Sequence, residues 1–154
     1  MTRYRRAHVP GGTFFFTVAL ADRGARTLVA EVGVLREAYA VAQRERPFRT
    51  EAIVVLPDHL HAVWTLPEGD ADFSSRWKRI KGDFSKRCEA EGRSRPSLAR
   101  KGERGVWQRR FWEHVVRDEA DLAAHVEYCR INPVKHGLVA EPEAWPFSSF
   151  RVRR

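Results

Sequence analysis

The chain has little cysteine, no long apolar run and comparatively few acidic residues. Only two of its 154 residues are cysteine, Cys88 and Cys129. Both fall on apolar positions of expected helices, which favours buried reduced thiols over a disulfide or a zinc site. No apolar run approaches the roughly 20 residues that cross a bilayer. The run at residues 14–20 (FFFTVAL) is too short for a span and lacks the cleavage pattern of a signal peptide. We therefore expect a soluble cytoplasmic protein with no membrane partner.

The shortage of acidic residues leaves a basic protein. The chain has 28 lysines and arginines against 20 aspartates and glutamates, a formal net charge of +8. Such an excess favours a polyanionic partner, either nucleic acid or an anionic surface. The length fits one domain over residues 1–154, with no internal repeat. A nucleic-acid partner would associate the protein with the nucleoid.

The order of expected strands and helices predicts an α+β fold. Strand-like composition occurs in four segments, residues 13–20, 53–56, 59–66 and 109–114. Apolar residues recur at helical spacing in three segments, residues 28–42, 74–88 and 118–131. Pro47 ends the first helix, Pro57-Asp58 forms the turn between the middle strands, and Asp118 is a candidate N-cap of the last helix. The order β-α-β-β-α-β predicts a ferredoxin-like sandwich with an antiparallel sheet. The added C-terminal helix would cover the remaining face of the sheet.

Two histidines flank one apolar residue in the third expected strand. Because side chains alternate across a strand, His59 and His61 share one face, while Leu60, Ala62 and Trp64 share the other. Two neutral imidazoles on one face are a candidate site for a divalent cation. A structural histidine pair is the alternative interpretation.

A tyrosine and an asparagine stand one turn apart in the last expected helix. Tyr128 and Asn132 are four residues apart and project from one face. The phenol is a candidate nucleophile, and the amide oxygen is a candidate ligand for a hard cation. The alternatives are a half-buried structural tyrosine and an asparagine that ends the helix before Pro133.

Three segments resemble one known family, the REP-associated tyrosine transposases, which belong to the single-tyrosine transposases of the HUH group of single-strand nucleases. These segments are residues 56–61 (LPDHLH), 79–85 (RIKGDFS) and 107–139 (WQRRFWEHVVRDEADLAAHVEYCRINPVKHGLV). The resemblance extends from about residue 13 to residue 150, and the three segments together are far more specific than any one of them.

The resemblance implies a role for each residue of the expected site. His59 and His61 match the histidine pair of the family, Tyr128 matches its nucleophile, and Asn132 matches its third metal ligand. The broader transposase group often has glutamine in that last place, and asparagine resembles the REP-associated branch. The implied cofactor is a divalent cation, Mg²⁺ or Mn²⁺. The implied reaction is cleavage and rejoining of single-stranded DNA through a covalent 5′-phosphotyrosine intermediate. Palindromic repeats folded as hairpins are the implied substrate.

Basic residues outside this site are candidate DNA contacts. They lie in the second expected helix, in a basic loop at about residues 91–106, in the basic tails and beside the asparagine. The candidates are Arg3, Arg5, Arg76, Arg79, Lys81, Arg93, Arg95, Arg100, Lys101 and Lys135. An ordinary solvated linker is the alternative interpretation of the loop.

Several rings remain ambiguous from the sequence. Tyr4, Trp107, Phe111 and Trp112 are candidates either for stacking on unpaired bases or for the core. His114 and His125 have weaker claims to function, and His136 is either a phosphate contact or, as we favour, a surface residue.

Two other functions agree with the same residues. One is a catalytically inert regulator that binds DNA or RNA hairpins on the same fold. The other is a metal-dependent phosphodiesterase that uses water, in which Tyr128 is only structural. Pure binding does not require the two histidines, the tyrosine and the asparagine together. For the oligomeric state we favour a monomer over a homodimer, because the basic tails can supply contacts within one chain.

Overall fold

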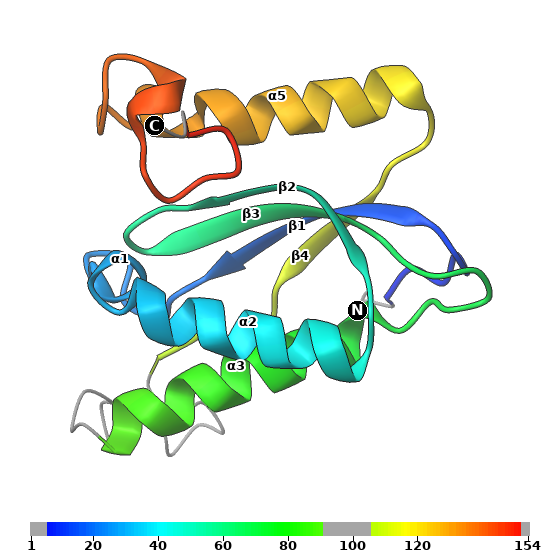
Figure 1. Ribbon diagram of the computed structural model, residues 1–154, viewed down its shortest axis with the longest axis horizontal. Helices are drawn as coiled ribbons and strands as arrows, with labels where there is room; N and C mark the ends of the chain where they lie inside the picture. The colour runs from blue at the N-terminus through cyan, green and yellow to red at the C-terminus, as the bar shows by residue number, and fades with distance from the viewer. Residues whose placement is uncertain (1–5, 91–105, 152–154) are drawn as a thin grey trace, which may run out of the picture.

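The computed structural model describes residues 6–90 and 106–151, and these form an antiparallel sheet with helices on both faces (Figure 1). The strands are β1 (Thr13–Ala19), β2 (Arg49–Val55), β3 (His59–Thr65) and β4 (Trp112–Val115). The helices are α1 (Thr27–Ala30), α2 (Val32–Glu45), α3 (Phe73–Ala90) and α5 (Glu119–Lys135), with a short 3-10 helix η1 (Pro142–Ala144). The sheet order is β2-β3-β1-β4, and each neighbouring pair is antiparallel. This order confirms the predicted ferredoxin-like α+β fold.

The sheet separates two layers of core. Alternation in β1 sends Phe14 and Phe16 toward α2 and α3, and sends Phe15 toward α5. Helices α2 and α3 lie side by side beneath one face, and α5 crosses the other (Figure 1). The segment after η1 lies beside the outer edge of β2, where the amide of Val55 donates to the carbonyl of Phe147 at 2.8 Å. The predicted position of the last helix, over the face that carries the histidine pair, is confirmed.

Several element boundaries differ from those predicted. The first helix is divided at Glu31, whose φ of −112° and ψ of 32° are not helical. Strand β2 begins at Arg49 rather than at Ile53, with an irregular register between Thr50 and Ala52. Strand β4 begins at Trp112, and α5 continues to Lys135 instead of ending at residue 131.

Gly137, rather than Pro133, ends helix α5. The amide of Leu138 donates to the carbonyl of Pro133, and the amide of Gly137 donates to the carbonyl of Val134, both at 2.9 Å. Gly137 has a φ of +71°, so these bonds form a Schellman cap at a left-handed glycine. The interpretation of Asn132 as a helix-ending residue is therefore wrong, and Asn132 lies within the last turn of the helix.

The described residues agree with the predictions on cysteines and on membrane spans. Cys88 and Cys129 are buried thiols outside any disulfide, and burial raises the pKa of Cys129 to about 12. None of the helices in the described ranges is long and apolar enough to span a membrane.

Candidate functional site

The histidine pair lies on the sheet face beneath α5. The rings of His59 and His61 are 4.9 Å apart between centroids, as expected for alternate residues of one strand. The ring of His61 lies against Phe15 of β1 at 5.3 Å and against Tyr128 of α5 at 5.2 Å. The sheet and the helix thus bring together the histidines and the tyrosine that the sequence predicted to be close.

His61 is held as a neutral imidazole with one nitrogen unpartnered. Its Nδ1 lies 2.9 Å from the hydroxyl of Thr17, the residue opposite it on β1, and it also bonds the backbone of Phe16. When Nδ1 carries the ring proton and donates it to the Thr17 hydroxyl, the lone pair lies on Nε2. Its buried Nε2 has no hydrogen-bond partner among the described residues. Burial, together with smaller effects of the neighbouring His59 and His136, lowers the pKa of His61 to about 3. The ring is therefore neutral at neutral pH, with a lone pair on Nε2.

His59 is oriented by a carboxylate. Its Nδ1 lies 2.8 Å from Asp58 Oδ1, while Arg23 donates to the other oxygen of Asp58 at 2.7 Å. Partial burial raises the pKa of Asp58, but the hydrogen bonds from Arg23 and His59 outweigh this effect and lower it. Burial lowers the pKa of His59, and Asp58 only partly offsets that effect. An ionised carboxylate accepts the Nδ1 proton, so Nε2 is the nitrogen left to bind a ligand.

Tyr128 is half-buried and is fixed by rings on two sides. Its ring meets that of Phe15 edge-on at 5.7 Å in addition to its contact with His61. The ammonium of Lys135 lies 5.0 Å from the centre of the Tyr128 ring. A phenol and a cation therefore lie together beside the histidine pair.

Asn132 lies on the same stripe of α5 as Tyr128 and is fully buried. Tyr128, Asn132 and His136 follow one another at intervals of four residues. The first of them contacts His61, and the last contacts His59, with 5.4 Å between ring centroids. Asn132 therefore lies between these contacts, facing the histidines.

The polar atoms of Asn132 make this site a candidate for a cation. Within the described part of the chain, neither the amide oxygen nor the amide nitrogen of Asn132 has a hydrogen-bond partner. An unpartnered buried polar group costs about 1–3 kcal/mol, so such groups call for an explanation. A divalent ion held by the amide oxygen and two neutral imidazoles would satisfy that oxygen and the Nε2 of His61, and the residues fit that group.

A second cluster of potential ligands differs in that its atoms already have partners. His114 of β4 lies near Asp121 and His125 of α5, and one ligand atom from each lies within 4.8 Å of the others. His114 Nε2 is 2.9 Å from Asp121 Oδ2, and His125 Nδ1 is 2.8 Å from the carbonyl of Asp121. The predicted N-cap is also confirmed, because Asp118 accepts from the amide of Asp121. Hydrogen bonding within the cluster explains these residues as a link between β4 and the start of α5.

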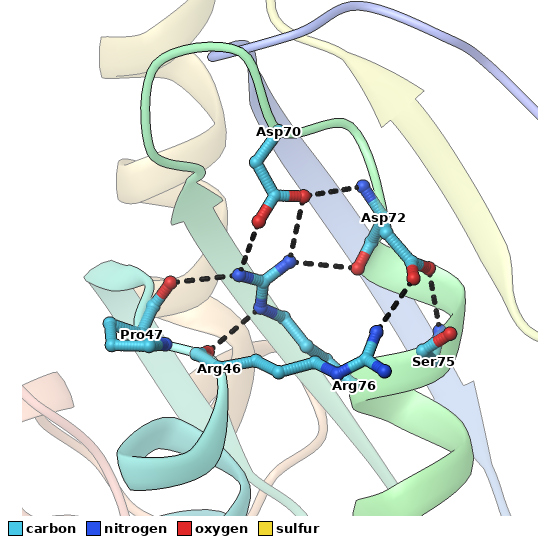
Figure 2. A network of polar contacts seen from close by, with 6 residues as sticks. All are labelled: Arg46, Pro47, Asp70, Asp72, Ser75 and Arg76. Atoms are coloured by element: carbon cyan, nitrogen blue, oxygen red, sulfur yellow. Dashed lines mark hydrogen bonds and ion pairs between the residues drawn. The ribbon is translucent and has the colours of Figure 1, made fainter.

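Arg76 is a correction to the predicted DNA contacts. Its side chain is 2% exposed and lies in a network of polar contacts between α3 and the loops at Pro47 and Asp70 (Figure 2). It donates two bonds to the carboxylate of Asp70 and one each to the carbonyls of Arg46, Pro47 and Asp72. All five of its donors are used, so Arg76 is a structural residue.

The other predicted contacts are spread over the molecule. On α3, Arg79 forms ion pairs with Asp83 of the same helix and with Glu45 of α2. The ammonium of Lys81, also on α3, donates to the carbonyl of Gln108 at 3.0 Å. Both lie on the helical layer across the sheet from the candidate site, whereas Lys135 lies beside Tyr128. Six of the predicted contacts lie outside the described residues, namely Arg3, Arg5, Arg93, Arg95, Arg100 and Lys101.

The structure separates the ambiguous rings. Trp107 is buried in the core, and Phe111 packs against that core. Trp112 is 52% exposed. Tyr4 lies outside the described residues.

Sequence reasoning missed the residues that orient the histidines. Thr17 and Arg23 were not predicted, and Asp58 was identified only as a turn residue. His136, which we expected to be a surface residue, contacts His59. The pairing of Thr17 with His61 depends on the register of β1 and β3, which strand alternation alone does not specify.

Comparisons with known proteins give one consistent family name. The chain matches no protein-family model. A REP-associated tyrosine transposase from Escherichia coli (strain K12) is 47% identical over 150 residues, covering 97% of this chain and 83% of that protein. A Haemophilus influenzae protein with the same family name is 43% identical over 151 residues, covering 97% of this chain and 86% of that protein.

Solved structures agree with this similarity. A structure of the REP-associated tyrosine transposase bound to a REP hairpin matches with a TM-score of 0.85 and 47% identity, covering 97% of this chain and 83% of that chain. A structure from Deinococcus radiodurans matches with a TM-score of 0.52 at 15% identity, covering 89% of this chain and 98% of that chain. The latter likeness concerns the fold alone.

Proposed function

Because the chain belongs to the REP-associated tyrosine transposases, we propose that it cleaves and rejoins single-stranded DNA at palindromic hairpin repeats. The observation that carries this proposal is the contact between Tyr128 and His61 at a site where Nε2 of His61 and the amide of Asn132 have no partner within the described ranges. A solved relative is bound to a REP hairpin, which supports a hairpin as the DNA partner.

The proposed reaction is a transesterification by Tyr128. Its phenol oxygen attacks the scissile phosphorus and forms a bond to it, while the bond from phosphorus to the 3′ oxygen breaks. The proton lost by the phenol is balanced by the proton gained at the released 3′-hydroxyl. The product is a 5′-phosphotyrosine, and reversal with another 3′-hydroxyl rejoins the strand. The enzyme is therefore a strand transferase more than a hydrolase.

The residues around Tyr128 prepare this attack. Phe15 and His61 fix the ring, so the phenol oxygen needs little reorganisation to reach a bound phosphate. Lys135, close to the ring, attracts the phosphate. Thr17 and Asp58 fix the tautomers of the two histidines, which directs both Nε2 lone pairs to the site.

The proposed ligands of a divalent cation, Mg²⁺ or Mn²⁺, are His59, His61 and Asn132. The orientation of the histidines and the lack of partners for Asn132 within residues 6–90 and 106–151 support this assignment. When bound, the cation supplies a Lewis acid that polarises the scissile phosphate.

A monomer is proposed as the active form. Tyr128 and His61 come into contact within one chain, so one copy holds both the nucleophile and the proposed ligands. Arg79, Lys81 and Lys135, with the basic loop and tails, are proposed to supply the DNA contacts of this single copy.

Replacing Tyr128 tests the proposal. Tyr128→Phe should abolish covalent product, a loss of more than about 10³-fold, because no other group in the site forms the phosphotyrosine. Hairpin binding and folding should be unchanged. The assay is a denaturing gel of protein incubated with Mn²⁺ and end-labelled hairpin.

Tyr39→Phe is the matched control. Tyr39 lies on the other face of the sheet, where its hydroxyl bonds Thr50 and Trp64, so its loss should lower stability but keep the covalent band. Cleavage that survives in Tyr128→Phe would favour a water-using phosphodiesterase. Binding with no covalent band in the wild type would favour an inert hairpin-binding regulator.

A further inference from the structure

Trp112 is the most exposed large apolar side chain in the described part of the chain, at 52%. The other four tryptophans, Trp64, Trp77, Trp107 and Trp145, are all at most 7% exposed. Exposing an indole gives up favourable burial, so its position calls for a reason.

The sheet register places Trp112 in line with the candidate site. Trp112 pairs with Thr17 of β1, and Thr17 pairs with His61 of β3. Residues opposite one another in neighbouring strands point to the same face, so all three side chains lie beneath α5. Two strand spacings of about 4.8 Å separate the backbones of Trp112 and His61 by about 10 Å. Stacked nucleotides rise by about 3.4 Å each, so a strand whose phosphate lies at His61 reaches Trp112 within a few nucleotides.

The indole is held in place by neighbouring rings. It is nearly parallel to the ring of His114, at 6.2 Å and 12°, and meets Phe15 edge-on at 6.0 Å. His114 in turn stacks on His125 at 4.5 Å and 20° and bonds to Asp121. The link between β4 and α5 therefore also supports Trp112, and a supported ring loses little conformational entropy on binding.

Two features of β4 favour a nucleobase over a second copy of the chain. Exposed arginines at 109 and 110 precede the strand and suit a polyanion. Arg6 donates to the carbonyl of Phe111, and the amide of Ala7 donates to Glu113 at 3.1 Å. The first contact occupies a backbone carbonyl just before β4, and the second places the N-terminal segment against the Glu113 side chain, where a second copy would have to approach this edge.

We propose that Trp112 is a stacking platform for one unpaired base within a few nucleotides of the scissile phosphate. This inference rests on the proposed function, because it assigns a DNA base to the same site. Stacking on an aromatic face is tolerant of sequence, so the platform holds the single-stranded flank in register without reading its identity.

The test is a double-mutant cycle between Trp112 and the DNA flank. The probes are a hairpin with a single-stranded flank, the same oligonucleotide with one abasic nucleotide placed at each flank position in turn, and the hairpin stem alone. Trp112→Leu should weaken binding of the flanked hairpin roughly 10- to 100-fold. One abasic position should weaken wild-type binding by a similar factor and have no further effect in Trp112→Leu. Both proteins should bind the stem alone equally, and Trp112→Phe should recover part of the loss.

Val9→Ala is the matched control, since Val9 is an exposed apolar residue outside the site, and it should bind every probe as the wild type does. Wild-type affinity of Trp112→Leu for all probes would overturn the inference, as would an equal loss on the stem alone. A Trp112-dependent dimer with no coupling to the flank would also overturn it. Coupling without any covalent product would keep the platform and reject the proposed function, whereas covalent product without coupling would reject the platform alone.

Discussion

Arg76, on one face of the sheet, and His61 with Asn132, on the other, are buried polar side chains whose atoms are bonded in opposite ways. On the α2 and α3 side, Arg76 uses all five of its donors on Asp70 and on backbone carbonyls (Figure 2). On the α5 side, His61 and Asn132 are as deeply buried, yet they have side-chain atoms with no partner among the described residues. A fully bonded buried group stabilises the fold, whereas an unpartnered one lowers stability unless a ligand satisfies it. The contrast separates the structural role of Arg76 from the ligand role proposed for His61 and Asn132.

The largest expected effect is on the structural side of this comparison. Arg76→Met should lower the free energy of unfolding by about 3–5 kcal/mol, because Asp70 and three carbonyls lose their partner in a buried network. Urea unfolding measures this effect. Arg79→Met is the matched control, since the half-exposed Arg79 makes surface ion pairs worth about 0–1 kcal/mol. Equal losses in the two variants would remove the contrast between buried and surface arginines.

The next effect is a dependence on pH caused by His61. Its pKa is about 3 in the folded protein and about 6.5 in an unfolded chain. Between these values the unfolded chain binds one more proton, so stability rises with pH and is lost on acidification below about 6.5. The loss should be about 2 kcal/mol between pH 6.5 and pH 4.5.

The measurement is urea unfolding in EDTA over this pH range, for the wild type and for His61→Gln. In the variant, the free energy of unfolding should change less steeply with pH, by about 1.4 kcal/mol per pH unit. The contribution of the carboxylates is common to both proteins and cancels in this comparison. Parallel slopes would mean that His61 is not held neutral by burial.

The smallest effect is expected on the binding side. Asn132→Leu removes two unpartnered buried atoms and keeps a similar volume, so stability in EDTA should stay within about 1 kcal/mol of the wild type. Saturating Mn²⁺ should stabilise the wild type, by about 2.7 kcal/mol at 100 times the dissociation constant. The variant should lose that gain. Thermal unfolding with and without Mn²⁺ measures both effects, and a loss of several kcal/mol in EDTA would mark Asn132 as structural.

The sequence predicted the order of the strands and helices, and the two pairs of site residues within single elements, because these features depend on local periodicity. Alternation placed His59 and His61 on one face, and a spacing of four placed Tyr128 and Asn132 on one stripe. The family resemblance connected the two segments, and the fold confirms that Tyr128 meets His61.

Residues whose roles depend on distant partners could not be predicted this way. Arg76 and Arg79 look alike in the sequence, and only packing against the loops at Pro47 and Asp70 makes one of them structural. Thr17 bonds His61, which is 44 residues away in the sequence, and this contact depends on the register of β1 and β3. Pro133 suggested that the helix ends near residue 132, but the helix continues to Lys135 and is ended by the cap at Gly137. The hydrogen bonds formed beyond the proline outweigh the one amide donor that Pro133 lacks.

The most direct test of this account is the spectroscopy of bound Mn²⁺. Pulsed electron paramagnetic resonance of the protein with one equivalent of Mn²⁺ should detect couplings from two imidazole nitrogens, from His59 and His61. His61→Gln should leave one coupling, and Asn132→Leu should weaken Mn²⁺ binding. The double variant of His114→Asn and His125→Asn should keep both couplings, because that cluster has its own hydrogen bonds. Mn²⁺ bound without nitrogen couplings, or couplings lost only in the latter variant, would contradict the assignment of the site beneath α5.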